Sequence, residues 1–255
     1  MFAQDPAIAS GGTINGASFQ VGQAVAAGSL VSIFGSNLAS SVQSADSIPL
    51  STSLGGATVT FQSDSASFTA PLLFAQPGTS SQINAQVPWE LTPAAGETQT
   101  VNVVVTRDGV ASAASPVTLT TAAPGLFAFG TNAVAVNNSD GTLAWATGAV
   151  AGVNSHPAKA GDFLILYATG LGPVDSSIED GHNSLDKLRN TVTLPTVLIG
   201  GVPATVLFSG LSPQFVGVNQ LNIQVAEGTP VGTVPIQIQM NGITSPNTIT
   251  MAVSQ

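Results

Sequence analysis

Acidic side chains are concentrated in one short segment, from Asp175 to Asp186. Its carboxylates belong to Asp175, Glu179, Asp180 and Asp186. Ca²⁺ takes several oxygen ligands at once, and the glycine after Asp180 lets a loop bend around a cation. The ligand spacing of an EF-hand is missing, however, and Lys187 and Arg189 follow at once and balance the charge. The segment therefore favours a solvated loop, with Ca²⁺ binding as the weaker alternative. We expect no cofactor.

Residues suited to catalysis are sparse. His156 and His182 are the two histidines of the chain, and no Gly-x-Ser-x-Gly motif occurs. Gly170-Leu-Gly172 is a fragment of a dinucleotide-binding fingerprint that runs directly into Pro173. A hydrolase would require one of the histidines to lie beside a buried carboxylate and a serine. The sequence does not predict an enzyme.

Two other segments alternate amide and apolar side chains. The amides are Gln82, Asn84 and Gln86 in the first segment and Gln220, Asn222 and Gln224 in the second. In a strand this alternation places each set of amides on one face. Such a face can contact sugar hydroxyls or a partner strand, or it can simply be the wet side of a sheet. Sugar sites commonly add aromatic rings, for which Trp89 and Trp145 are the candidates.

The composition excludes some partners and indicates others. Charged residues make up 7% of the chain, and four basic residues against thirteen acidic ones give a formal charge of -9. This charge cannot neutralise a phosphate backbone, so nucleic acid is excluded. There is no cysteine for a disulfide or a thiolate metal site. No apolar run is long enough to span a membrane. Low charge with abundant Ser, Thr, Asn and Gln is typical of secreted surface proteins that tolerate close contact with their own copies.

The chain repeats itself in three blocks that occur in the same order. The matching pairs are 28–38 with 161–171, 81–87 with 219–225, and 108–112 with 241–245. This repeat predicts two copies of one domain, each too long for a solenoid repeat. We expect an N-terminal extension at 1–25, a first β-sandwich at 26–122, a connector at 123–158 and a second β-sandwich at 159–255.

Period-two patterns dominate both copies and predict an all-β fold. Strands are expected at 57–61, 101–106, 116–120, 234–240 and 247–253. Asp108-Gly109 and Asn241-Gly242 favour the positive φ angles of type I′ hairpin turns, and Gly200-Gly201 predicts another tight turn.

Two segments have no counterpart in the repeat. Within the connector, residues 133–136 and 142–145 flank a polar turn and predict a hairpin. In the N-terminal extension, the apolar residues suited to docking are Ala7, Ile8, Ile14 and Phe19. This extension could cover its own domain or add as a strand to a neighbouring copy.

Six motifs in this order resemble a known family. They are Asn15–Phe19, Gly28–Leu38, Gln82–Trp89, Ala123–Phe127, Leu166–Pro173 and Ile199–Ala204. They are similar to the uncharacterised C-terminal domain family of Solibacter-type secreted proteins, over nearly the whole chain. Each half is also similar to the immunoglobulin-like IPT/TIG module. The resemblance implies a secreted or surface-exposed pair of β-sandwiches with no assigned activity. Such modules are usually attached to larger proteins, and we expect this chain to be the whole mature protein.

These observations together predict a non-catalytic extracellular protein of a bacterium. We expect a structural or adhesive role, with copies of the chain as partners in a surface filament assembled through the N-terminal segment and bare sheet edges. The alternative is a secreted carbohydrate-binding or adhesion module whose partners are surface glycans. Neither hypothesis involves nucleic acid or membrane insertion.

Overall fold

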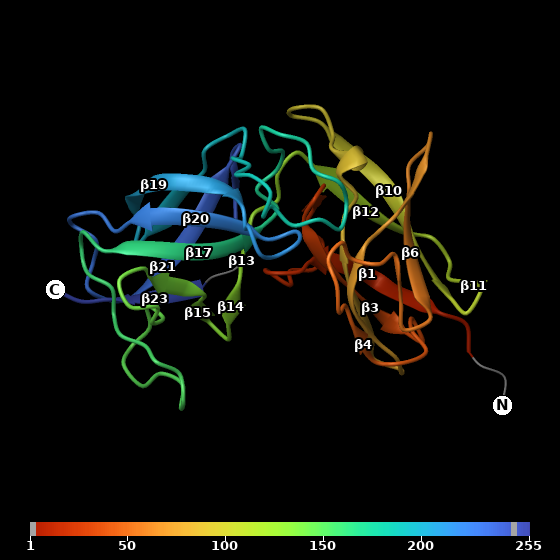
Figure 1. Ribbon diagram of the computed structural model, residues 1–255, viewed down its shortest axis with the longest axis horizontal. Helices are drawn as coiled ribbons and strands as arrows, with labels where there is room; N and C mark the ends of the chain where they lie inside the picture. Colours follow the sequence, from red (N-terminus) through yellow and green to blue (C-terminus); the bar gives the residue numbers. More distant parts are fainter. Residues whose placement is uncertain (1–3, 246–248) are drawn as a thin grey trace.

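Two all-β domains lie next to each other, and the chain begins and ends at opposite ends of the molecule (Figure 1). The computed structural model describes residues 4–245 and 249–255. Strands form nearly all of the regular structure in this part of the chain, together with one short 3₁₀ helix, η1 (Trp89–Leu91). The all-β prediction is confirmed.

The first domain is a sandwich of two sheets, ordered β1-β3-β9-β8-β4 and β2-β12-β10-β6-β5, with β7 paired to β6 and β11 to β10. The first sheet consists of β1 (Ala7–Asn15), β3 (Leu30–Ser36), β9 (Ser81–Gln86), β8 (Leu72–Gln76) and β4 (Gln43–Ser44). The second consists of β2 (Val25–Ala26), β12 (Ser115–Thr120), β10 (Thr98–Arg107), β6 (Ala57–Gln62), β5 (Ser53–Leu54), β7 (Ser67–Thr69) and β11 (Val110–Ala111). The orders β1-β3-β9-β8 and β12-β10-β6 match the A-B-E-D and G-F-C sheets of an immunoglobulin domain.

The second domain repeats this arrangement, but strand β19 takes part in both of its layers. The strands are β13 (Gly125–Leu126), β14 (Ala128–Phe129), β15 (Asn132–Ala133), β16 (Ala135–Asn137), β17 (Phe163–Thr169), β18 (Thr196–Ile199), β19 (Val202–Leu211), β20 (Asn219–Gln224), β21 (Gly232–Met240), β22 (Ile243–Thr244) and β23 (Ile249–Val253). One layer is β16-β17-β20-β19, and the other is β18-β21-β23-β15. β19 pairs with β18 through residues 202–204 and with β20 through residues 205–211. The chain is therefore a tandem pair of immunoglobulin-like sandwiches.

Alternating side chains build the two cores. In β6, Ala57, Val59 and Phe61 point inward and are fully buried, while the threonines between them are partly exposed. Separate clusters of buried apolar residues fill the two domains. The predicted hairpin turns are confirmed, because both residues of Asp108-Gly109, Asn241-Gly242 and Gly200-Gly201 have positive φ angles. Residues 247 and 248 of the predicted last strand lie outside the described residues.

The N-terminal segment belongs to the first domain. β1 pairs antiparallel with β3 of the same domain, and Ile14 is buried there. Of the two alternatives predicted for the segment 1–25, docking on its own domain is the one that the described residues show, because β1 is a strand of the first domain's own sheet. Ala7 and Ile8 pair with Ser36 and Gly35, so they are not a free assembly segment.

The predicted connector is likewise part of a domain. β16 pairs with β17 in one layer, and β15 runs parallel to β23 in the other. In the first domain, β1 and β2 occupy the same two places, with β2 parallel to β12. A bridge between Val136 and Leu143 confirms the predicted hairpin, but its position within the second sandwich was not anticipated.

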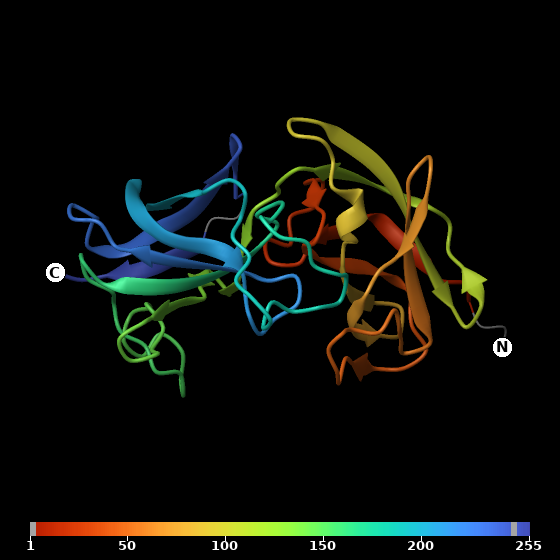
Figure 2. The same cartoon turned by 45° about the horizontal axis from the view of Figure 1, so that its top comes forward.

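Polar contacts join the two domains along their boundary. The Leu30 N–H of β3 donates to Thr169 Oγ1 at 2.9 Å, and the Thr169 hydroxyl donates to the Gly217 carbonyl oxygen at 2.6 Å. The buried Asn15 side chain donates to the Ala123 carbonyl oxygen at 2.9 Å. The segment after β17 also crosses to the first domain beside η1 (Figure 2). These contacts hold both sandwiches at a defined orientation.

Candidate functional site

The amide rows lie on corresponding faces of the two domains. Gln82 and Asn84 of β9 and Gln220 and Asn222 of β20 are half-buried, and the residues between them point into the core. In each pair the glutamine donates to the asparagine, with Nε2–Oδ1 distances of 2.7 Å and 2.9 Å. These contacts leave the glutamine carbonyl oxygen and the asparagine amino group available to a ligand.

Aromatic rings flank both amide pairs at equivalent positions. Phe34 of β3 lies opposite Gln82, and Tyr167 of β17 lies opposite Gln220. On the other side, Phe74 lies opposite Asn84 and Phe208 lies opposite Asn222. A β-bulge directly before Phe74 and another before Phe208 shift the register at the same place in both domains.

A second ring contacts the first ring in each domain. Phe19, which is 51% exposed, lies 6.4 Å from Phe34 between ring centroids. Phe215, which is 52% exposed, lies 6.2 Å from Tyr167. Phe19 has a φ of 55°, in the left-handed region that a bulky residue rarely adopts. The two outer rings come from unrelated loops, so the repeat alone does not account for their similar placement.

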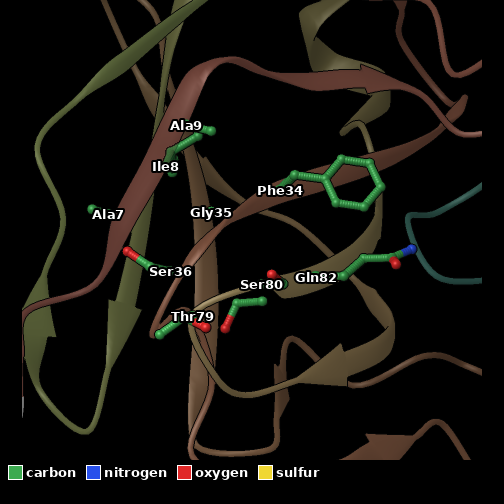
Figure 3. Close-up of a pocket in the computed structure, with 10 residues that line it drawn as sticks. Ala7, Ile8, Ala9, Phe34, Gly35, Ser36, Thr79, Ser80 and Gln82 are labelled. Atoms are coloured by element: carbon green, nitrogen blue, oxygen red, sulfur yellow. The ribbon is translucent and has the colours of Figure 1, made fainter.

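We call these surfaces the aromatic–amide faces. In the first domain the face is Phe19, Phe34, Phe74, Gln82 and Asn84, and in the second it is Tyr167, Phe208, Phe215, Gln220 and Asn222. Beside the first face is an open depression of about 530 Å³, lined partly by Phe34, Gln82 and the hydroxyls of Thr79 and Ser80. Figure 3 shows the Phe34 ring and the Gln82 amide projecting on the same side of the sheet. Neither face contains a charged side chain.

The third amide of each predicted row has a structural role. Gln86 is buried and donates to the Gly28 carbonyl oxygen at 3.3 Å. Gln224 donates to the Gly161 carbonyl oxygen at 3.1 Å, and Gly161 corresponds to Gly28 in the repeat. The prediction that Gln86 contacts a ligand is wrong, because this side chain is buried and holds the turn that precedes β3; for Gln224, which is half-buried and holds the turn that precedes β17, ligand contact stays a prediction.

The two predicted tryptophan platforms are also corrected. Trp145 is only 3% exposed, and its indole Nε1 donates to the Ala133 carbonyl oxygen at 2.6 Å. Trp89 packs over Gly28 at the domain boundary, so closely that a Cβ at position 28 would overlap the indole ring. Neither ring stands beside an amide pair. The rings beside the amide pairs are those of phenylalanine and tyrosine, so the prediction of tryptophan platforms is wrong.

The four carboxylates of the segment 175–186, which we call the acidic loop, contact different partners. Asp186 forms a two-bond ion pair with Arg189, which holds the pKa of Asp186 at about 2. Asp175 accepts hydrogen bonds from the main chain and side chain of Asn190. Asp180 accepts a hydrogen bond from the Trp89 N–H, and Glu179 lies 3.9 Å from His182. Among the described residues no group of three or more metal-ligating side chains is found. The alternative of a Ca²⁺ site built by these four carboxylates is therefore wrong.

Neither histidine pairs with a buried carboxylate, which the hydrolase hypothesis requires: Asp140 beside His156 is 44% exposed, and Glu179 beside His182 is 89% exposed. His156 Nε2 lies 2.8 Å from Asp140 Oδ2, and its Nδ1 lies 2.9 Å from the Pro157 carbonyl oxygen. The contact with the Pro157 carbonyl and the hydrogen bond to Asp140 both raise the pKa of His156. Because both ring nitrogens are engaged, this imidazole has no free position from which to deprotonate a serine. His182 Nδ1 faces the Asp180 carbonyl oxygen and Glu179.

The fold and these faces define a two-domain immunoglobulin-like protein. No protein-family model matches the chain, and no curated protein matches it either, so the resemblance to the Solibacter-type family stays a prediction. In the described residues no helix is long and apolar enough to cross a membrane.

Several solved structures are similar to this chain at low identity. The extracellular region of plexin A4 is 11% identical with a TM-score of 0.27; the match covers 100% of this chain, which spans only 34% of that chain. The titin domains Z1Z2, solved in complex with telethonin, are 12% identical with a TM-score of 0.22, covering 100% of this chain and 98% of that chain. The C-terminal domain of the Streptococcus agalactiae AgI/II polypeptide BspA is 11% identical with a TM-score of 0.21, covering 92% and 95%. The fold assignment itself rests on the strand pairing.

Proposed function

We propose that this chain is a non-catalytic extracellular adhesion module that binds carbohydrate through its aromatic–amide faces. The observation that supports this proposal is the recurrence of one arrangement, a clamped Gln–Asn pair between aromatic rings, in both domains. Export from a bacterium and membership of the Solibacter-type family are parts of the same proposal.

The chemistry of the faces suits sugar rings. A pyranose has apolar C–H faces that pack against aromatic rings, and hydroxyls that pair with amide donors and acceptors. Binding sites typically combine such apolar area with a few well-placed polar groups. Each face supplies rings whose edges or faces reach solvent, together with a glutamine oxygen and an asparagine amino group that are not used within the pair.

The charge of the chain narrows the carbohydrate class. The formal charge is -9, and the faces contain no basic side chain to pair with a carboxylate or sulfate. An anionic polysaccharide would be repelled by the field of the protein as a whole. The ligand is therefore a neutral polysaccharide.

The simplest mode of filament assembly, donation of the N-terminal strand to a neighbouring copy, is not favoured by this structure. In the described residues the N-terminal strand is paired within its own sheet, so donation of this strand to a neighbour would require β1 to leave β3. Assembly through other sheet edges stays a prediction. Light scattering or electron microscopy of the concentrated protein would reveal it as ordered oligomers.

Affinity electrophoresis on gels that contain a neutral or a sulfated polysaccharide tests the binding proposal. We expect retardation by at least one neutral polysaccharide and none by the sulfated one. The variant with both Gln82→Ala and Gln220→Ala should lose about tenfold in affinity per face, as expected for the loss of one hydrogen-bonding side chain.

Gln237→Ala serves as the matched control, because Gln237 is a half-buried strand amide on the opposite sheet of the second domain. This variant should be retarded as strongly as the unchanged protein. No retardation by any neutral polysaccharide, or equal loss in the Gln237→Ala control, would contradict the proposal.

A further inference from the structure

The tip of the acidic loop forms a three-point contact between the domains. The Gly181 N–H donates to Gln86 Oε1 at 2.7 Å, and the Leu50 N–H donates to the Gly181 carbonyl oxygen at 2.9 Å. The third contact is the Trp89 N–H, which donates to Asp180 Oδ1 at 3.0 Å. We call this contact the loop-tip lock. It joins the loop that follows β17 to the end of β9 and to η1 in the first domain.

The half-buried carboxyl group of Asp180 takes part in the loop-tip lock. Burial of Asp180 at the boundary raises its pKa to about 6 from an ordinary value of 3.8, although the Trp89 N–H opposes the change. The nearby Glu90 carboxyl of η1 also raises the pKa of Asp180. Two like charges cannot both be accommodated at a partly buried boundary without weakening it.

We propose that the loop-tip lock is a proton-dependent latch: it is closed while the Asp180 carboxyl, which accepts the Trp89 N–H at this boundary, is protonated, and it loosens when that carboxyl is ionised. The docked loop binds a proton that the released loop gives up. Docking is therefore fully stabilised below pH 3.8, and this stabilisation is lost as the pH rises through about 6. The contacts of Leu30 and Asn15 do not involve this carboxyl, so they remain as the hinge.

The charged and uncharged groups that face Asp180 can be named from each neighbouring element. Glu90 is the group on η1 whose charge acts on Asp180, whereas Gln86 of β9 and Leu50 of the facing segment are uncharged. Within the loop itself, His182 faces the main-chain carbonyl oxygen of Asp180, and the exposed Glu179 faces His182. His182 is therefore the position for a control substitution.

Amide hydrogen exchange of the full chain, followed by NMR, tests the latch. The three lock amides belong to Leu50, Trp89 and Gly181, and the hinge amide of Leu30 serves as an internal reference. Protection relative to intrinsic exchange reports the opening equilibrium. Between about pH 5 and about pH 7.5, we expect the protection of the lock amides to fall by about tenfold, which allows for solvent screening of a half-exposed carboxyl. The Leu30 amide should keep its protection.

Variants identify the responsible group. Asp180→Asn keeps an oxygen acceptor for Trp89 but cannot ionise, so its lock amides should be equally protected at both pH values. Glu90→Gln should reduce the pH dependence, and His182→Asn should leave it unchanged. The latch is refuted by pH-independent protection in the unchanged protein, by an Asp180→Asn variant that retains the full dependence, or by a His182→Asn variant that abolishes it.

Discussion

The two domains share their inner strands but each builds one edge strand from unrelated sequence. β9 and β20 match residue by residue, from the amide pairs to the buried Ile83 and Leu221. The edge strands β1 and β16 lie in segments for which the repeat gives no match, yet they occupy the same place beside β3 and β17. An inner strand must satisfy two neighbouring strands and a core, whereas an edge strand has one neighbour. Sequence similarity is therefore retained where the constraints are most numerous.

Substitution of the central core residues should have the largest effect. Ile83 and Leu221 are completely buried at equivalent positions. Ile83→Ala and Leu221→Ala should each lower the free energy of unfolding by about 3 kcal/mol, because each leaves a cavity in a closed core. Urea denaturation measures both values. Leu207→Ala, at an exposed position of β19, should cost less than about 0.5 kcal/mol. A loss as large for Leu207 as for Leu221 would contradict the role of burial, and clearly different losses for Ile83 and Leu221 would contradict the equivalence of the two cores.

Two equivalent glycines should differ in their tolerance of a side chain. Gly28 and Gly161 both have positive φ angles, of 72° and 88°. Gly161 has open space around it, whereas Gly28 lies against the Trp89 indole of the domain boundary. Gly161→Ala should cost about 1 kcal/mol for backbone strain alone. Gly28→Ala should cost about 3 kcal/mol because the indole must also move. Thermal unfolding compares them, and equal losses would show that the Trp89 contact is unimportant.

The rings of the two faces should contribute similarly to binding. Phe34→Ala and Tyr167→Ala should each weaken the affinity for a neutral polysaccharide by about fivefold, because each removes an aromatic surface worth about 1 kcal/mol. Tyr167→Phe retains the ring and should bind within about twofold of the unchanged protein. Isothermal titration calorimetry provides the affinities. An Ala variant that binds as tightly as the unchanged chain would show that its aromatic–amide face does not contribute to binding.

The smallest effect concerns a contact found in the second domain alone. The exposed pair His156–Asp140 ties the hairpin after β16 to the segment before β17. Because the pKa of His156 is raised above 6.5, the contact stabilises the fold fully below pH 6.5 and ceases to do so as the pH rises through the raised value. NMR titration of Asp140→Asn should show a lower His156 pKa. An unchanged value would mean that the Pro157 carbonyl alone causes the shift.

Much of the fold could be predicted from the sequence because its signals are local. Alternation in β6, β10, β12 and β21 and the turns at Asp108-Gly109 and Asn241-Gly242 depend on neighbouring residues only. The places of β1 and β16 in the sandwiches could not be predicted, because they depend on which sheet edge each segment meets and not on neighbouring residues. Ala135 and Val136, for example, read equally well as one arm of an isolated connector hairpin.

The candidate site could be predicted only in part. The positions of Gln82, Asn84, Gln220 and Asn222 follow from alternation within one strand, but their aromatic partners come from neighbouring strands and loops. The register that places Phe34 opposite Gln82 is set by strand pairing, and the placement of Phe19 and Phe215 depends on turns. Repetition of an aromatic position, Phe34 with Tyr167, was the one available signal. The burial of Gln86 and Trp145 depends on domain packing that no local pattern records.

The most direct test of the account is an NMR titration of the isotope-labelled chain with a neutral oligosaccharide that retards it on gels. The side-chain amide signals of Gln82, Asn84, Gln220 and Asn222 should shift together, while those of Gln86 and Gln237 stay in place. That result would show that both aromatic–amide faces bind the same class of ligand. Shifts confined to other surfaces, or no shift at any concentration, would contradict the claim that these faces carry the function.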